Sequence, residues 1–160
     1  MIAVVLGGAA CLWDDLRALG PFAGAVVAVN QAGVYYPYRV DHWATLHPEN
    51  LPHWMRQRAI RGRSVDVEVW ADPVPGWETG SSGLHAVKCA LDRGYAPVVL
   101  CGVPMDSGAH FHDASPWPVA DEHWPTWLDR ANEMRGRVFS MSGRTRDLLG
   151  APSWLLARSA

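Results

Sequence analysis

The chain has 160 residues, of which 49% are hydrophobic and 19% charged, and its formal net charge is −2. This composition excludes a disordered chain, and the small net charge gives no support to nucleic-acid binding. No apolar run approaches the ~20 residues that span a bilayer. Residues 1–10 lack a basic start and predict a strand, not a signal peptide. The three cysteines are far apart in sequence, which is typical of reduced thiols, so we expect a cytoplasmic protein.

The first half of the chain predicts strands that alternate with helices. Uninterrupted apolar runs predict strands at 2–6 and 25–29, and a third strand is expected at 42–46. Leucine spacing predicts a helix at 12–19, and a second helix is expected at 49–60. The arginines that crowd the end of this second helix are expected on a solvated face: Arg56, Arg58, Arg61 and Arg63. Strict alternation at 65–70 predicts a half-exposed strand near a sheet edge, followed by a loop at 72–79.

The stretch 80–106 organises the rest of the chain. Ser81 or Ser82 can cap a helix whose apolar face is set by residues at helical spacing. Gly94 is well placed to end that helix in a left-handed conformation. A valine-rich run at 97–101 predicts a strand that is covered on both faces, and Gly102 ends it.

The last third predicts a loop and then two or three further elements. Residues 107–118 lack periodicity and are expected to form a long surface loop. A helix is expected at 121–135, a buried strand at 138–141 and a short helical turn at 145–149. The alternation as a whole predicts one α/β domain over residues 1–160, a Rossmann-like three-layer fold with a mainly parallel sheet.

Glycines and polar residues follow the predicted strands. Gly7 and Gly8 follow the first strand, Asn30 the second and Gly102 the valine-rich one. Ligands of open parallel sheets bind beyond the carboxyl ends of the strands, so we expect these residues to meet there. The serine-rich turn at 80–83 begins a helix, and its free amides would suit a phosphate or a carboxylate. The alternative is a capped helix with nothing bound.

Three side chains, one just before residues 107–118 and two within them, are of the types that bind metal ions. Asp106, His110 and His112 could bind zinc, but a fourth ligand is missing, and we expect no bound metal. The absence of an Asp-x-Asp pair also argues against a transferase that holds its sugar nucleotide through a metal. His85 and Cys89 share a helix face and are expected to pack in the core.

Trp77 and Trp117 lie in predicted loops. Tryptophans in loops are the better candidates for stacking on a ligand, whereas those at helical spacing are expected to fill the core.

The stretch 80–106 resembles small bacterial sialyltransferases that use CMP-sialic acid. The resemblance rests on Ser82-Gly83, Ala90-Leu91, Gly94-Tyr95 and Gly102-Val103. It extends to the strand that runs into Gly7-Gly8, to Asn30-Gln31, to His47-Pro48 where that group has Asn-Pro, and to residues 138–143. The related family that is similar to archaeal hydroxymethylpterin pyrophosphokinases, the motility-accessory type, shares the same segment.

The resemblance implies a Rossmann-like fold that binds a nucleotide and carries a catalytic histidine. His123 is the nearest match by position to that histidine, and His110 and His112 are its rivals. The chain departs from the group in its first loop, which lacks the asparagine and serine that help to hold the nucleotide. The paired tyrosines that help the phosphate to leave have no counterpart after Gly102.

Two functions follow as hypotheses. The first is a small transferase with no cofactor besides a nucleotide or nucleotide sugar as substrate, in which one of the three histidines is the general base. The residues expected to line its nucleotide side are Gly7, Gly8, Asn30, His47, Ser81, Ser82, Gly83 and Gly102. The second is a non-catalytic Rossmann-like module that binds a ligand or a protein, in a phage or mobile-element setting. Homo-oligomer formation is left open.

Overall fold

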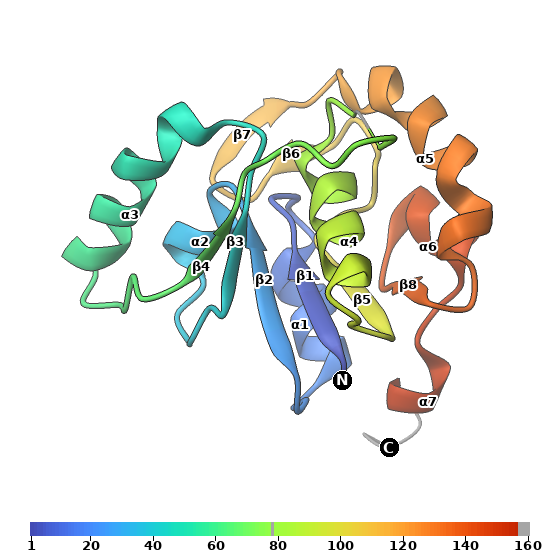
Figure 1. The fold of residues 1–160 in the computed structure, drawn as a ribbon, viewed down its shortest axis with the longest axis horizontal. Helices are drawn as coiled ribbons and strands as arrows, with labels where there is room; N and C mark the ends of the chain where they lie inside the picture. Colours follow the sequence, from blue (N-terminus) through green and yellow to red (C-terminus); the bar gives the residue numbers. More distant parts are fainter. Residues whose placement is uncertain (78, 157–160) are drawn as a thin grey trace.

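The computed structural model describes residues 1–77 and 79–156, which form strands and helices in alternation (Figure 1). The strands are β1 Ala3–Leu6, β2 Ala25–Val29, β3 His42–Ala44, β4 Glu68–Trp70, β5 Val98–Cys101, β6 Ala109–His110, β7 Asp113–Pro116 and β8 Val138–Ser140. The helices are α1 Leu12–Leu19, α2 Ala32–Tyr35, the 3₁₀ turn η1 Pro48–Asn50, α3 Leu51–Ile60, α4 Ser82–Asp92, α5 Ala120–Met134, α6 Gly143–Leu149 and α7 Ser153–Leu156.

Six of the strands form one parallel sheet in the order β4-β3-β2-β1-β5-β8. The chain starts in the middle, builds outward to β4, and then crosses over to β5 on the other side of β1. The strand order therefore reverses between β1 and β5, and this reversal is the point at which open α/β sheets bind ligands. The predicted α/β domain with a parallel sheet is confirmed.

Helices cover both faces of the sheet, which makes three layers. Ala3 and Val5 of β1 face α4 and α5, whereas Val4 and Leu6 face α1. Successive residues of β1 and β5 thus lie alternately in one of two cores, since successive side chains of a strand point to opposite faces, and Trp43 of β3 belongs to a third, smaller cluster. This is why the strands are continuous apolar runs and do not alternate with polar residues. Burying one such valine contributes on the order of 1.5–3 kcal/mol.

The region 107–118 differs from the prediction of a loop without secondary structure. Strands β6 and β7 pair there as an antiparallel hairpin, which Figure 1 shows above the carboxyl edge of the sheet. All four residues of β7 are exposed, so the segment has no buried face that periodicity could detect. Its pairing depends on the residues below it, because Ala9 of the first loop forms a β-bridge with His110.

Smaller differences concern the ends of elements and two short helices. The edge strand β4 begins at Glu68, not at residue 65, and β3 ends at Ala44. Helices α2 and α7 were not predicted; each has four residues, too few for a periodic signal.

Arg58 corrects the expectation of a wholly solvated arginine cluster. Its side chain is buried, and its guanidinium donates to the backbone carbonyls of four residues: Gly33, Tyr36, Tyr38 and Ser64. Burial lowers the pKa of this guanidinium, but the carbonyl oxygens replace the water that its N–H groups would otherwise bind.

Among the described residues, none of the helices has both the length and the apolar character that crossing a bilayer requires.

Candidate functional site

A cavity of about 660 Å³ lies at the carboxyl edge of the sheet, at the reversal of strand order. Its floor is formed by the residues that follow β1, β2 and β5, and one wall is the N-terminus of α4. The β6–β7 hairpin and the start of α5 lie on the other sides. A volume of this size is within the range of small-molecule sites.

Two glycines allow the loops after β1 and β5 to meet at the cavity floor. A Cβ atom on Gly7 would lie 2.2 Å from the carbonyl oxygen of Gly102. Gly102 itself has a φ of +69°, and a Cβ atom there would lie 2.8 Å from Cβ of Leu12. Any side chain at either position would push these loops apart, so the floor of the cavity depends on both glycines.

The amides of the first loop are largely used within the protein. Gly7 N–H donates to the carbonyl of Cys101 (2.8 Å) and Ala9 N–H to that of Gly102 (3.1 Å). Ala10 N–H donates to the carbonyl of Ala109 in the hairpin (3.0 Å). The usual phosphate cradle of such folds is therefore poorly supplied with donors here.

The N-terminus of α4 provides donors instead. Ser81 is the N-cap, and its hydroxyl accepts from Leu84 N–H and from the indole N–H of Trp127, each at 3.3 Å. The hydroxyl of Ser82 accepts from Leu46 N–H at 3.2 Å, which ties α4 to the residue stretch after β3. The amides of Ser82 and Gly83 belong to the first helical turn and have no intrahelical acceptor. They line the cavity at the positive end of the helix dipole.

Asn30 is held in a left-handed conformation, with a φ of 49°. Its side-chain oxygen accepts from the hydroxyl of Thr45 (2.8 Å), and its carbonyl accepts from the indole N–H of Trp43 (2.9 Å). With the oxygen occupied, the NH₂ group is the part of the side chain that can donate to a ligand. A fixed, strained residue of this kind at a strand end is typical of binding sites.

Aromatic and imidazole rings follow one another across the hairpin side of the cavity. His112 stacks on Tyr35 of α2 with 6.0 Å between ring centroids, and His110 stacks on His112 at 5.3 Å. Trp117 lies 5.4 Å from His110 and 6.1 Å from His123 of α5. The three histidines therefore belong to one run of rings.

Two glycine contacts position the ends of this run. A Cβ atom on Gly8 would lie 3.0 Å from Cδ2 of His110, and one on Gly80 would lie 2.4 Å from Cε1 of His123. The ring of His110 thus rests on the first loop, and that of His123 lies beside the turn that begins α4.

Burial lowers the pKa of both His110 and His112, and the proximity of His112 lowers that of His110 further. Both rings are therefore neutral at pH 7 and able to accept a proton. Cys11 differs, because burial raises its pKa to about 11 and leaves it a protonated thiol. It contacts Ser142, which also donates to Asp15, and these residues support the floor from behind.

The charges that line the cavity are unusual for an anion site. None of its described lining residues is a lysine or an arginine, and two of them, Asp106 and Asp113, are carboxylates. Over residues 1–77 and 79–156, no group of three or more His, Cys, Asp or Glu side chains is arranged to hold a metal ion. The absence of a bound metal stays a prediction.

The cavity brings together all the residues predicted for the nucleotide side and the three candidate histidines. These are Gly7, Gly8, Asn30, His47, Ser81, Ser82, Gly83, Gly102, His110, His112 and His123. Of the two tryptophans proposed for ligand stacking, Trp117 lines the cavity, but Trp77 is buried in the core and donates to Glu133. The roles of the cavity-lining residues toward a ligand stay predictions.

Trp54 and Met105 also line the cavity and were not predicted. Trp54 lies within the helix predicted at 49–60, and Met105 has a φ of 54° that the sequence does not signal. His85 and Cys89 are buried as expected, with His85 Nε2 at 3.1 Å from the carbonyl of Trp70.

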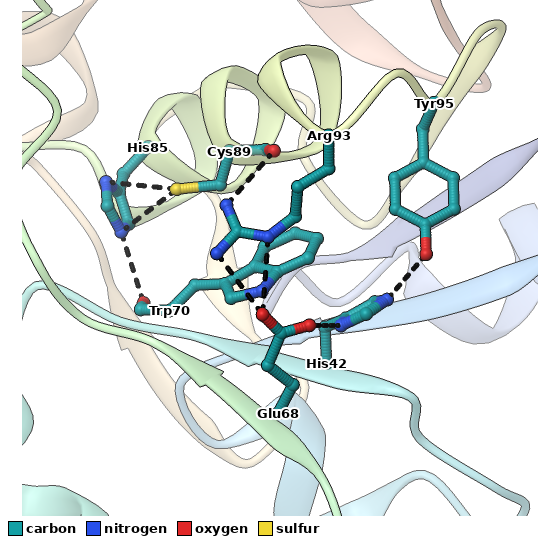
Figure 2. Close-up of polar contacts among 7 residues, drawn as sticks. All are labelled: His42, Glu68, Trp70, His85, Cys89, Arg93 and Tyr95. Atoms are coloured by element: carbon teal, nitrogen blue, oxygen red, sulfur yellow. Dashed lines mark hydrogen bonds and ion pairs between the residues drawn. The ribbon is translucent and has the colours of Figure 1, made fainter.

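A larger and more open hollow of about 1290 Å³ lies at the opposite, amino edge of the sheet, beside a second polar cluster (Figure 2). His42 Nε2 bonds the hydroxyl of Tyr95 (2.8 Å), and its Nδ1 lies 2.9 Å from a Glu68 oxygen. Arg93 reaches Glu68 and lies over the ring of Trp70 at 4.4 Å. These contacts join β3, β4 and the end of α4, although Trp70 Nε1 has no hydrogen-bond partner among the described residues, and we interpret the cluster as structural.

Comparison with known proteins gives a likeness of fold. No family model and no curated protein matches the sequence. The fold is similar to the crystal structure of the sialyltransferase CST-II in complex with a trisaccharide acceptor and CMP, with a TM-score of 0.60 at 11% identity over 94% of this chain and 86% of that one. It is also similar to the sialyltransferase CstII from Campylobacter jejuni in complex with a substrate analogue, cytidine-5′-monophosphate, with a TM-score of 0.56 at 12% identity over 94% of this chain and 84% of that one. At such identity the likeness establishes a sialyltransferase-like fold.

Proposed function

We propose that this protein binds a nucleotide or nucleotide sugar in the 660 Å³ cavity and transfers the linked group, a sugar, without a metal ion. One observation carries the proposal. The open first turn of α4 meets the floor at the strand-order reversal, in a fold that two solved neighbours share, both described in complex with CMP.

In this proposal the phosphate binds at the N-terminus of α4, and the nucleoside binds at the residues that follow β2 and β3. The Ser82 and Gly83 amides would donate to the phosphate, where the helix dipole favours negative charge. The NH₂ group of Asn30 would donate to the nucleoside, and His47 borders the same side of the cavity. Trp117 would lie against the transferred group or the acceptor.

His123 is the base in this proposal, because its ring lies beside the Gly80 turn that leads into the phosphate-binding amides. It would take the proton of an acceptor hydroxyl as the oxygen attacks the sugar carbon. The bond from that carbon to the phosphate oxygen breaks, and its electron pair leaves on the nucleotide phosphate. The α4 amides would stabilise the charge that develops there.

The test of binding is thermal unfolding with CMP, CDP, UMP, GMP, AMP and CMP-sialic acid. A ligand at 100 times its Kd adds about 2.7 kcal/mol to the free energy of unfolding. A shift for a cytidine nucleotide supports the proposal, and the absence of a shift for all six ligands would overturn it.

The test of catalysis is the release of CMP from CMP-sialic acid, with and without sugar acceptors. We expect His123→Gln to lower the rate by 10²–10⁴-fold while CMP still binds, as for the loss of a general base. His53→Gln, on the exposed face of α3, is the matched control and should leave the rate unchanged.

A non-catalytic nucleotide-binding module is the second candidate, and the first loop favours it. The hairpin is hydrogen-bonded to this loop through Ala10 N–H and through Phe111 N–H, which donates to the carbonyl of Gly8. Binding of CMP without any turnover of CMP-sialic acid or another nucleotide sugar would identify this function.

A further inference from the structure

The cavity has donors for an anion but no fixed cation to balance it. Its described lining residues include no lysine or arginine, and the carboxylates of Asp106 and Asp113 border it. A phosphate dianion that leaves water for this site would meet amides and a helix dipole, whose partial charge is only about +0.5. The Arg144 guanidinium donates to the carbonyl of the lining residue Met105, but it is paired with Asp121 and does not line the cavity. Among the described lining residues, a full positive charge requires an imidazole that gains a proton.

The stacked pair His110 and His112 is placed to supply that charge. Their rings are nearly parallel, at 10°, with 5.3 Å between centroids, and both line the cavity. The pair lies between Tyr35 and Trp117, so neither ring is free to turn away. Two imidazoles so close can share one positive charge but resist two, since like charges repel.

We propose that a nucleotide phosphate enters this cavity together with one proton, which the His110–His112 pair takes from solvent. The inference rests on the proposed function, and it names how the site balances the charge of its ligand. Protonation of the pair would give the phosphate a charged donor opposite the α4 amides, and loss of that proton at higher pH would release the ligand.

The charged groups around the pair determine whether protonation of the two rings is favoured or disfavoured. On the hairpin Asp113 favours the protonated form of both rings. Asp106 borders the same cavity, and His123 of α5, a third imidazole, lies next to Trp117. Arg61 lies over the ring of Tyr35, at 5.0 Å from its centroid, and is the cation on the Tyr35 side of the pair.

In the free protein, burial and mutual repulsion win, and the pair is neutral at pH 7. A bound dianion reverses this balance because it adds two negative charges in a partly dry site.

Isothermal titration calorimetry of the 160-residue chain with CMP at pH 7.5 measures the proton uptake directly. At this pH CMP is almost wholly a dianion, since its second phosphate pKa is about 6. The enthalpy in Tris and HEPES buffers should differ by an amount that corresponds to an uptake of about 0.3–1 proton per CMP. Between pH 7 and pH 8.5 the Kd should rise, by up to about tenfold per pH unit.

The double variant His110→Gln/His112→Gln should lose both the uptake and this pH dependence, and His53→Gln should keep them. If the double variant does not fold, His112→Gln with its cooperative unfolding verified replaces it: His110 would then take the proton without the repulsion of its partner, so the pH range of the uptake should shift to higher pH. CMP binding without proton uptake would overturn this inference and leave the proposed function standing, as would an uptake that survives both substitutions. No binding of CMP or the other nucleotides would overturn both.

Discussion

At the scale of single residues, the site depends on contacts that only glycine permits. Gly7 and Gly102 let two loops touch at the cavity floor, while Gly8 and Gly80 let two histidine rings lie against the backbone. The four positions share no sequence motif. What they have in common is a neighbour close enough to collide with a Cβ atom.

Gly7→Ala should destabilise the protein by at least about 2 kcal/mol, because its Cβ would lie 2.2 Å from a backbone carbonyl oxygen that cannot turn away. Urea unfolding measures the change. Gly94→Ala is the control: Gly94 has a φ of +79° but nothing within 4 Å, so only the left-handed strain of about 1–2 kcal/mol applies. Equal losses in the two variants would contradict the crowding argument.

Arg58 shows how one residue can take a role opposite to that of its sequence neighbours. Its guanidinium donates to a carbonyl within α2, to two carbonyls that follow α2 and to one that follows α3. Arg56, two positions earlier, is exposed on the same helix.

Arg58→Met should therefore cost about 3 kcal/mol, since the methylene stem is replaced but several buried carbonyls lose their donor. Arg56→Met should change the free energy of unfolding by less than about 0.5 kcal/mol. Chemical denaturation of the two variants side by side checks the contrast. A small loss for Arg58→Met would mean that water reaches these carbonyls.

At the scale of elements, α4 is the piece that both closes the site and anchors the edge of the sheet. Its N-terminus is fixed by Ser81 and Ser82 and faces the cavity. Arg93 and Tyr95 follow its C-terminal end. Tyr95 bonds His42 at the start of β3, and Arg93 bonds Glu68 at the start of β4 (Figure 2). One helix thus connects the carboxyl edge of the sheet to its amino edge.

Tyr95→Phe should lower the free energy of unfolding by about 1 kcal/mol, because it removes the 2.8 Å hydrogen bond to the buried His42 ring. Tyr38→Phe removes a hydroxyl from a residue that is 72% exposed and should change stability by less than about 0.5 kcal/mol. If the two variants have the same stability, the hydrogen bond between Tyr95 and His42 stabilises the fold no more than the hydrogen bonds with water that replace it in the unfolded chain.

At the scale of the whole molecule, several histidines couple stability to pH in the same direction. Burial lowers the pKa of four of them below the ordinary value of 6.5: His42, His85, His110 and His112. The unfolded chain therefore binds more protons than the folded one as the pH falls through 6.5. Their contribution to stability is complete above that value and is lost progressively below it.

We expect the free energy of unfolding to fall between pH 7.5 and pH 5.5, with the largest share from His85, which is 2% exposed. His85→Gln keeps a donor for the carbonyl of Trp70 and should flatten the pH profile by about 1 kcal/mol over this interval. His53→Gln, with an exposed side chain, should not change the profile. Urea unfolding at four pH values measures it, and a stability that rises toward pH 5.5 would show the sign to be wrong.

The sequence by itself determined the fold class and the composition of the cavity. Buried parallel strands must be apolar on both faces, so β1, β2 and β5 appear as uninterrupted runs that any reader can locate. Their carboxyl ends meet at one edge by geometry, so the residues that follow them could be assigned to one site. Helix α4 was recognisable because its cap and its left-handed Gly94 are local signals.

Only the tertiary structure decided the features that depend on residues far apart in the chain. The hairpin over residues 109–116 exists because Ala9 and Ala10 pair with it, and none of its own residues signals a strand. Arg58 is buried because distant carbonyls converge on it. The amides of the first loop donate to the carbonyls of Cys101 and Gly102 and to the hairpin, so the N-terminus of α4 supplies the donors for an anion. The pattern of a segment predicts which element it can form. The hydrogen-bond partners of its polar groups often lie in other segments, so they cannot be predicted from that segment alone.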